Sequence, residues 1–360
     1  MAVTIKKVQK NTVTAASLLK QFQKDMGDGA GSYGSHWVNA DRIPTGMFEL
    51  DLALSGGFPR GKVSMIFGPE SSNKTNIALL AIAQHQKLWP ELTCVFVDLE
   101  NEYNAPWAKS LGVDTDKLIL LKPAYAEQAV DMVEAMLLAD DVGLVVLDSL
   151  AALVGTAELD KSAEGETPGA AGRISGKLYR KTIAAFVEAE KRGRYPSLFY
   201  INQITYKIGV MFGNPETTPG GKKPWFQSAI VLRVYGNNII DSKISKVMPV
   251  RKEVSFVIKK FKVPILAASG KFEMATQPHG GLEIGQCDDA NTIKGYLESF
   301  GEWFAADKKG WSIFGEHYAT QKAWKERFYS EPAYANKVRG HVIKTMMAGG
   351  EIDDDGGSDE

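Results

Sequence analysis

Cysteine is scarce in this chain of 360 residues, with two copies at Cys94 and Cys287. Two cysteines cannot build a disulfide framework or a cysteine-rich metal cluster. The five histidines are scattered, without a spacing typical of metal ligands. Cys94 lies in an apolar run and is predicted to be a core residue. We therefore expect a protein of a reducing compartment, whose chemistry depends on other side chains.

Long apolar runs are also absent from the sequence. A membrane-spanning helix needs about 20 consecutive apolar residues, and no stretch of this chain reaches that length. The amino terminus has no signal-peptide pattern. We therefore expect a cytoplasmic protein with no membrane partner. With 44% hydrophobic and 24% charged residues, the composition is that of a globular protein rather than a disordered one.

The net charge of −1 conceals an acidic tail. The last ten residues carry six carboxylates and no basic side chain, so the remainder holds 37 acidic against 42 basic residues. A mildly basic body with an acidic tail is typical of a protein whose tail competes with an anionic partner. A tail that only improves solubility would explain the charge pattern equally well.

One stretch of eight residues carries the clearest chemistry: Gly68-Pro69-Glu70-Ser71-Ser72-Asn73-Lys74-Thr75. It lies between a strand-like run and a helix-like run, which is the context of a phosphate-binding loop. Backbone N–H groups of such a loop and of the following helix point at phosphate oxygens. We expect Lys74 to lie along the β- and γ-phosphates and the Thr75 hydroxyl to hold Mg²⁺. A serine-rich turn before a core helix is the alternative for this stretch taken alone.

Asn73 departs from the phosphate-loop pattern, which has a second glycine at this position. Asparagine tolerates the left-handed backbone region better than most non-glycine residues, so we expect the loop to form. The Asn73 side chain stands where the backbone of the loop approaches the phosphates closely. The affinity for nucleotide or its turnover can therefore differ from that of a loop with glycine at this position.

Strand-like and helix-like runs alternate through the middle of the chain. The predicted strands are 63–67, 93–99, 117–121, 143–148 and 197–203, and the predicted helices are 48–54, 77–88, 105–110, 126–139 and 174–191. This alternation predicts an α/β fold with a mostly parallel central sheet that is covered on both faces. Three more strands, at 229–235, 253–260 and 271–274, are expected to be antiparallel at the sheet edge.

The chain divides into four predicted parts. They are an N-terminal helical arm with a glycine-rich linker (1–35), the α/β core (36–278), a small C-terminal α/β lobe (279–346) and a disordered acidic tail (347–360). Residues 1–35 are too few to fold alone.

Polar residues end three of the predicted parallel strands. We expect the Asp148 carboxylate to help hold Mg²⁺ beside the phosphate loop. Glu100, if its strand is a neighbour, can position the attacking water, and Gln203 can sense the γ-phosphate. A solvated acid at a strand end is the alternative for Glu100.

Two glycine-containing segments, 160–172 and 213–221, are predicted to be loops beside this edge. Arg173, Lys177, Arg180 and Lys181 follow the first loop at helical spacing, which suits a nucleic-acid backbone. A solvated helix face explains Arg173 and Arg180 equally well.

Taken together, these motifs resemble the RecA family of homologous-recombination proteins. The resemblance rests on the phosphate loop, the Asn202-Gln203 pair and above all the run Lys207-Ile208-Gly209-Val210-Met211-Phe212-Gly213-Asn214-Pro215-Glu216-Thr217-Thr218. It covers nearly the whole chain and is strongest over 43–221. It implies a RecA-type P-loop ATPase core and a DNA-dependent ATPase that uses ATP and Mg²⁺. It also implies a head-to-tail helical filament on single-stranded DNA, strand exchange with a homologous duplex, and single-strand-binding and mediator proteins as partners.

The resemblance also implies roles for individual residues. Glu100, Lys74 and Gln203 are the expected catalytic residues, and Thr75 and Asp148 the expected metal ligands. Nucleotide contacts are expected from the phosphate loop, Asp148 and Trp107, which stands where the family places an adenine-stacking tyrosine. By the resemblance, the first DNA-binding loop is expected at about 160–172 and the second at about 204–221. The expected DNA contacts are Arg173, Arg180, Tyr206, Lys207, Ile208, Thr217, Gly220 and Gly221. Lysines that reach a neighbour's ATP are expected among Lys259, Lys260 and Lys262, with no choice between them.

Departures from the family pattern keep two alternatives open. Asn73 replaces glycine, Thr205 and Tyr206 replace a usually basic and a methionine-like residue, and the end of the second loop is altered. Such drift resembles a phage- or plasmid-encoded member. The first alternative is a RecA-core motor or helicase that forms closed rings. The second is an ATP-binding DNA filament protein that hydrolyses ATP weakly because of Asn73.

Overall fold

A computed structural model describes residues 14–26, 41–153, 170–206, 216–240, 248–279, 282–302, 304–305 and 310–348. Some of the predictions above lie outside these residues. They concern most of the glycine-rich linker, the first predicted loop up to residue 169, Lys207 and Ile208 in the second loop, and the acidic tail from residue 349.

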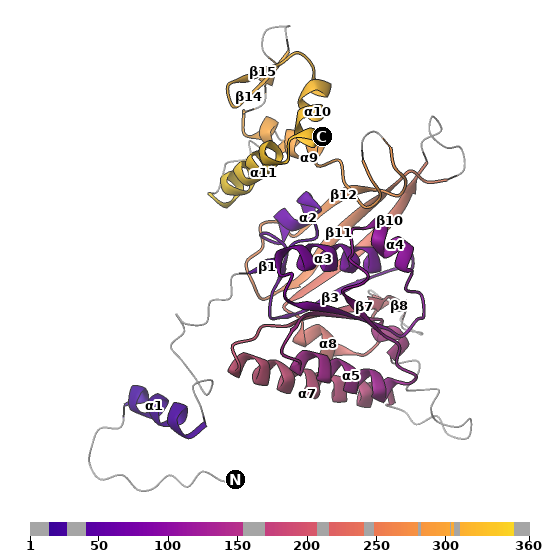
Figure 1. The fold of residues 1–360 in the computed structure, drawn as a ribbon, viewed down its shortest axis with the longest axis vertical. Coiled ribbons are helices and arrows are strands. Elements are labelled where there is room, and N and C mark those ends of the chain that lie inside the picture. The colour runs from indigo at the N-terminus through magenta and orange to yellow at the C-terminus, as the bar shows by residue number, and fades with distance from the viewer. Residues whose placement is uncertain are drawn as a thin grey trace, which may run out of the picture.

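An eight-stranded sheet forms the centre of the molecule (Figure 1), with the strand order β12-β11-β10-β3-β7-β6-β4-β5. Six adjacent strands are parallel: β10 (Ile230–Ile239), β3 (Val63–Gly68), β7 (Ser197–Gln203), β6 (Val142–Asp148), β4 (Thr93–Asp98) and β5 (Leu118–Leu121). β11 (Arg251–Phe261) and β12 (Ser269–Ala275) complete the sheet as antiparallel strands. The predicted α/β fold with a mostly parallel sheet is therefore confirmed.

The prediction for one of these strands was wrong. The run 229–235 was expected to be antiparallel at the edge, but β10 pairs in parallel with β3 and has two further strands beyond it. Its first residues, including Ile230, Val231 and Leu232, are fully buried because β3 and β11 flank them. The first partly exposed residue is Arg233, where the pairing with β3 ends, and the residues from Tyr235 onward are all half-buried or exposed.

Helices cover both faces of the sheet (Figure 1). α2 (Phe48–Ala53), α3 (Lys74–Leu88) and α4 (Ala105–Ser110) lie on one face, and α5 (Ala126–Leu138), α7 (Ala170–Lys191) and α8 (Lys222–Gln227) lie on the other. The short strands β1 (Arg42–Ile43) and β2 (Phe58–Pro59) pair beside α2 and α3.

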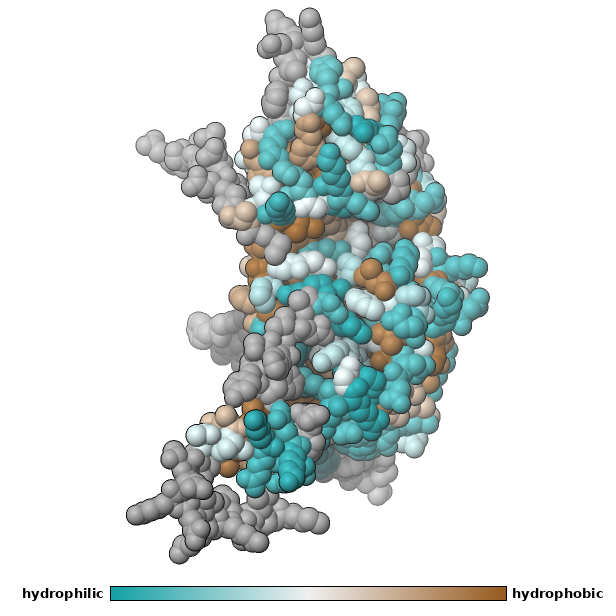
Figure 2. Space-filling view, turned by 60° about the vertical axis from the view of Figure 1, so that its left-hand side comes forward, coloured by the Kyte–Doolittle hydropathy of each residue, from teal (hydrophilic) through white to brown (hydrophobic). Residues whose placement is uncertain are grey.

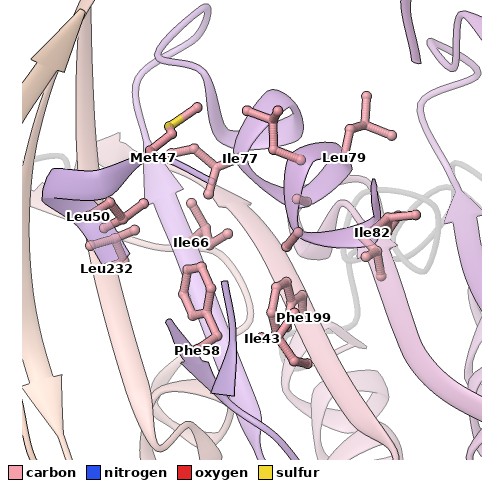
Figure 3. Close-up of a cluster of buried hydrophobic side chains, with 14 of the residues drawn as sticks. Ile43, Met47, Leu50, Phe58, Ile66, Ile77, Leu79, Ile82, Phe199 and Leu232 are labelled. Carbon is pink, nitrogen blue, oxygen red and sulfur yellow. The ribbon is translucent and has the colours of Figure 1, made fainter. Parts of the chain in front are cut away.

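Alternating side chains of the central strands enter two separate hydrophobic cores. Phe199 and Ile66 pack beneath α3 with Ile77 and Leu232 (Figure 3). Leu198, next to Phe199 in the chain, belongs to the core beneath α5 and α7. Because successive strand residues point to opposite faces, burial on both faces produces the near-continuous apolar runs of the sequence.

Two segments that were predicted as loops contain regular structure. α7 begins at Ala170, so the last three residues of the predicted loop 160–172 are helical. Within the second loop, β8 (Thr205–Tyr206) pairs with β9 (Glu216–Thr217), and α8 follows directly. The turn-forming residues of the second loop suggested only a mobile segment, since strands of two residues leave no hydrophobic pattern.

The C-terminal lobe has a core of its own. It contains α9 (Asp289–Ser299), α10 (Gln321–Ser330), α11 (Pro332–Met347) and a small antiparallel sheet of β13 (Phe304–Ala305), β14 (Trp311–Ile313) and β15 (Glu316–Tyr318). Trp324 and Phe328 are buried at its centre, and Phe48 and Leu52 of α2 pack into the same cluster. The lobe is therefore docked on the main domain through α2.

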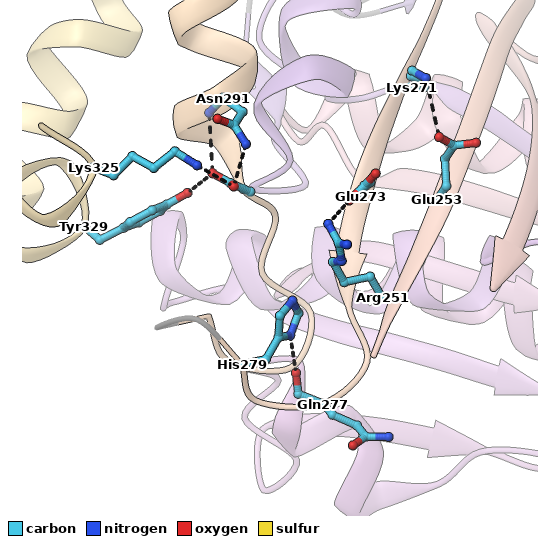
Figure 4. Close-up of polar contacts among 10 residues, drawn as sticks. Arg251, Glu253, Lys271, Glu273, Gln277, His279, Asn291, Lys325 and Tyr329 are labelled. Carbon is cyan, nitrogen blue, oxygen red and sulfur yellow. Dashed lines mark hydrogen bonds and ion pairs between the residues drawn. The ribbon is translucent and has the colours of Figure 1, made fainter. Parts of the chain in front are cut away.

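Polar contacts secure the start of the lobe (Figure 4). The Asp288 carboxylate accepts hydrogen bonds from Lys325 at 2.9 Å and from Tyr329 at 2.6 Å. It also caps α9 by accepting from the Asn291 backbone N–H. These bonds hold α10 against the first turn of α9, because one carboxylate serves both helices.

The surface is mainly hydrophilic on the face drawn in Figure 2. α1 (Ala15–Met26) lies away from the sheet (Figure 1), and its Leu18 and Phe22 are exposed. Within the described residues, none of the helices combines the length and the apolar composition required to cross a bilayer.

Trp324→Ala should destabilise the lobe by about 3–5 kcal/mol, because it removes a fully buried aromatic side chain and leaves a cavity. The free energy of unfolding can be followed by near-ultraviolet circular dichroism in urea. The control is Lys322→Ala on the same helix, whose side chain is exposed. Equal effects of the two substitutions would contradict the assigned lobe core.

Candidate active site

The candidate site lies where neighbouring parallel strands end level with one another. In the sheet register, Gly68 of β3 is opposite Gln203 of β7, and Asp98 of β4 is opposite Asp148 of β6. The carboxyl ends of all four strands therefore meet at one edge. Ligands of open α/β sheets bind at this edge. The condition set for Glu100, that its strand should neighbour that of Asp148, is fulfilled.

The phosphate loop needs its first glycine and accommodates Asn73. A Cβ atom on Gly68 would lie 2.2 Å from the Val234 carbonyl oxygen, so no other residue fits there without a backbone shift. Asn73 has φ +79° and ψ +15°, in the left-handed region, and directly precedes α3 without a capping hydrogen bond from its side chain. The expectation that asparagine can adopt this conformation is confirmed. Ser72 Oγ closes the loop by donating to the Pro69 carbonyl oxygen at 2.7 Å.

Lys74, Thr75 and Asp148 meet at the first turn of α3. The Lys74 ammonium donates to the Pro69 carbonyl oxygen at 2.6 Å, and the Thr75 hydroxyl donates to Asp148 Oδ2 at 2.8 Å. Burial raises the pKa of Asp148 to about 7, although the Thr75 hydrogen bond opposes the shift. Burial lowers the pKa of Lys74, against the attraction of Asp148 and Glu100. A hydroxyl and a carboxylate held together are oxygen ligands of the kind that fit Mg²⁺.

Glu100 and Gln203 are in direct contact. Gln203 Nε2 donates to Glu100 Oε1 at 3.2 Å, and the Ser149 hydroxyl donates to the same oxygen. The Glu100 carboxylate is thus held between the residue that follows Asp148 and the end of β7. Ser149 was not predicted as a site residue, since a serine after a strand-end aspartate has no distinctive pattern.

A cavity of about 230 Å³ joins these residues. It is lined by the loop residues Glu70 to Thr75, by Glu100, Asp148 and Gln203, and by Asn76, Glu102, Ser149, Ile201 and Lys252. The last five were not predicted. Trp107 contacts the cavity-lining residue Asn76: its indole Nε1–H donates to Asn76 Oδ1 at 2.8 Å.

Lys252 brings a second cation to the loop from a distant part of the chain. It lies on β11, and its ammonium donates to the Ser71 carbonyl oxygen. Burial lowers the pKa of Lys252, as it does for Lys74. No local signal could have identified it, because a lysine in an alternating strand usually faces solvent.

The end of β7 is tied to the second predicted DNA-binding loop. Asn202 is fully buried, and its Nδ2 donates to the Pro219 carbonyl oxygen at 3.0 Å. Three residues after Asn202, Thr205 pairs with Thr217 across the β8–β9 ladder. A movement of the Gln203 side chain can therefore be transmitted to Thr217 through these few residues.

A buried ion pair anchors β9 to the sheet. Arg233 of β10 contacts Glu216 at 2.6 Å, with side-chain exposures of 15% and 14%. Thr217 and Gly221 line a cavity of about 510 Å³ beside this pair, together with Phe67, Trp225 and Lys259. Gly220 and Gly221 have φ values of +84° and +69°, which explains glycine at both positions.

The four basic residues of α7 from Arg173 to Lys181 divide into two pairs. Lys177 and Lys181 contact Asp131 of α5 at 3.2 and 3.0 Å, so they serve helix packing. Arg173 and Arg180 are exposed, as a DNA contact requires. Gly176 lies between them, next to the ammonium of Lys223 on α8. The exposure of the two arginines fits both a DNA contact and the solvated-face alternative.

Lys259, Lys260 and Lys262 lie far from the phosphate loop of their own protomer. Lys260 pairs in register with Val231 of β10, whereas Lys252 is level with Asn238. The Lys260 ammonium donates to the carbonyl oxygens of Trp225, Phe226 and Ser228, and that of Lys262 donates to Phe226. Burial, with repulsion from Lys262, lowers the pKa of Lys260 to about 8.

Glu216→Gln should destabilise the segment 216–221 by up to about 3 kcal/mol, because it leaves the Arg233 charge buried and unpaired. Faster amide hydrogen exchange in that segment would report the loss. Glu253→Gln, which breaks the more exposed pair with Lys271, is the control and should cost under about 1 kcal/mol. If both variants exchange alike, the ion pair does not anchor β9.

Comparisons with known proteins agree with this geometry. The family model described as the RecA N-terminal domain matches residues 13–275. Protein RecA of Thermus aquaticus is 34% identical over 343 residues, which cover 92% of this chain and 95% of the relative. Protein RecA of Acholeplasma laidlawii is 35% identical over 79% of this chain and 84% of the relative. Protein RecA of Mesomycoplasma hyopneumoniae is 37% identical over 74% and 77%. The chain therefore belongs to the RecA family of homologous-recombination proteins.

Proposed function

We propose that this recombinase hydrolyses ATP with Mg²⁺ at the phosphate-loop edge of its sheet, and does so when it is bound to single-stranded DNA. The observation that carries the proposal is the convergence of Lys74, Asp148 and Glu100 on one cavity. A cation for phosphate, an acid for the metal and an acid for water are the groups that phosphoryl transfer to water requires.

Different residues of the site would bind different parts of the nucleotide. Backbone N–H groups from residue 70 to Thr75 would hold phosphate oxygens at the positive end of α3. Lys74 would leave the Pro69 carbonyl oxygen for the phosphates, which attract its charge more strongly. Thr75 and Asp148 would hold Mg²⁺, which neutralises phosphate charge. Trp107 would provide an aromatic wall for the base.

Glu100 and Gln203 would act on the third phosphate. Glu100, held by Ser149, would accept a hydrogen bond from the attacking water and so orient it. Gln203 can donate either to Glu100, as it does here, or to a γ-phosphate oxygen. Because Asn202 and the β8–β9 ladder follow directly, this exchange of partners would move the second DNA-binding loop.

DNA would bind along the exposed arginines of α7 and the second loop. Arg173 and Arg180 are exposed and would contact phosphates, and backbone N–H groups at Gly220 and Gly221 can approach closely. Tyr206, Lys207, Ile208 and Thr217 belong to the same proposed surface. Contacts to the backbone predict binding with little sequence preference and a strong dependence on salt.

The proposed assembly is a head-to-tail filament, in which residues 1–35 form an arm that contacts the next protomer. Lys260 and Lys262 would reach the neighbour's nucleotide, since they lie at the far end of β11 from their own phosphate loop. Lys259 is assigned instead to the cavity beside β9. Single-strand-binding and mediator proteins would load the filament in the cytoplasm, and the acidic tail would limit access of duplex DNA.

Glu100→Gln should lower the DNA-stimulated kcat for ATP at least about 100-fold, since it removes the group that orients water. Affinity for ATP and filament length in electron micrographs should persist, because the phosphate contacts remain. The control is Glu102→Gln, also at the cavity edge, with turnover within a few-fold of the parent. Unchanged kcat in Glu100→Gln would remove Glu100 from the mechanism. Closed rings instead of filaments would favour the motor alternative.

The shared site can be tested by mixing two inactive variants. Lys74→Ala should lose its own nucleotide site, and Lys260→Met/Lys262→Met should lose the charges offered to the neighbour. A mixture should recover ATP turnover that neither variant has alone, because some interfaces join an intact site to intact lysines. Lys271→Met, which removes the charge of one exposed lysine on β12, is the control and should keep its turnover without mixing. No recovery in filaments that contain both variants would place the lysines outside the site.

A further inference from the structure

We propose that Asn73, Asn76 and Trp107 form a hydrogen-bonded relay that positions the phosphate loop from the base-binding side of the site. The inference rests on the proposed function and adds to it that base and phosphate binding are coupled inside one protomer. Residue 73 is then a functional adaptation of this chain, because it connects two parts of the site that a glycine would leave separate.

The relay consists of three consecutive hydrogen bonds. Trp107 Nε1 donates to Asn76 Oδ1 at 2.8 Å, and Asn76 Nδ2 donates to Asn73 Oδ1 at 3.0 Å. Asn73 Nδ2 completes the series by donating to the Met274 sulfur at 3.7 Å. The contacts join α4, the first turn of α3, the phosphate loop and β12.

The direction of the relay is fixed by the indole group. An indole N–H can only donate, so Asn76 must present its carbonyl oxygen to Trp107. The Asn76 amide nitrogen is then left for Asn73, whose own carbonyl oxygen must face it. The two amide orientations therefore follow from the tryptophan, and phenylalanine at residue 107 would remove the donor that sets them.

The surroundings make the relay effective. Asn73 is 6% exposed and Met274 is fully buried, so water cannot easily replace lost partners. Trp107 is itself held at the start of α4, where Asn104 Oδ1 accepts from its backbone N–H at 2.9 Å. Asn73 needs such support, because a non-glycine residue at φ +79° is intrinsically strained.

The relay reaches the phosphates through the backbone. Asn73 occupies the position directly before the first residue of α3, Lys74, so its backbone angles set the direction of the first N–H groups of the helix. A base stacked on Trp107 would restrict the indole and, through Asn76, the Asn73 side chain. The loop would then be ordered best when the base is in place.

The test uses a ligand that has phosphates but no base. Tripolyphosphate cannot touch Trp107, so Trp107→Phe removes none of its contacts. We expect Trp107→Phe to weaken tripolyphosphate binding by roughly 3- to 10-fold in the parent, as for the loss of one partly buried hydrogen bond. In an Asn73→Gly background, which lacks the relay, the same substitution should have no effect. Asn76→Ala should behave like Trp107→Phe in both backgrounds.

Two controls separate the relay from other effects. Trp89→Phe, at the opposite end of α3, should leave tripolyphosphate affinity unchanged. Thermal unfolding of the same variants without any ligand should show the same non-additivity between residues 73 and 107. Equal effects of Trp107→Phe in both backgrounds would overturn the relay. Failure of the parent chain to bind either ATP or tripolyphosphate would instead overturn the proposed function.

Discussion

The register of the parallel strands is the constraint on which the rest of the molecule depends. Gly68 stands opposite Gln203 and Asp98 opposite Asp148, so the groups of the site are brought level by backbone pairing alone. A slip of one residue would turn every side chain to the other face of the sheet. The two hydrophobic cores prevent it, since neighbours such as Leu198 and Phe199 belong to different cores. The chemistry at the strand ends thus depends on apolar packing along their length.

Most of the fold could be predicted because strands buried on both faces leave continuous apolar runs, and their order along the chain alternates with helices. β10 was misassigned for a physical reason. Its first half is flanked on both sides and its second half only by β11, so a single run of sequence contains two patterns. β8 and β9 were missed because paired segments of two residues are held by tertiary contacts such as the Glu216–Arg233 ion pair.

The site was predicted where a motif or a strand end carries it, and missed where tertiary structure brings residues together. Thr75, Asp148 and Glu100 follow from the phosphate loop and the parallel topology. Lys252 and Asn76 do not, since a lysine in an alternating strand or an asparagine in a helix has many ordinary roles. Arg180 and Lys181 are adjacent in the sequence, yet the lysine is paired with Glu134 while the arginine is exposed.

β11 shows how one strand can serve two nucleotide sites in the proposed filament. Lys252 lies beside its own phosphate loop, and Lys260 lies eight residues further on, about 25 Å along the strand. A two-fold symmetric dimer joins two identical surfaces. It could bring this end of β11 to the partner's phosphate loop only if both features lay in that one surface. Head-to-tail stacking repeats one contact between unlike surfaces and can do so at every interface. Each nucleotide would then contact two protomers and couple its own chemical state to the contact between them.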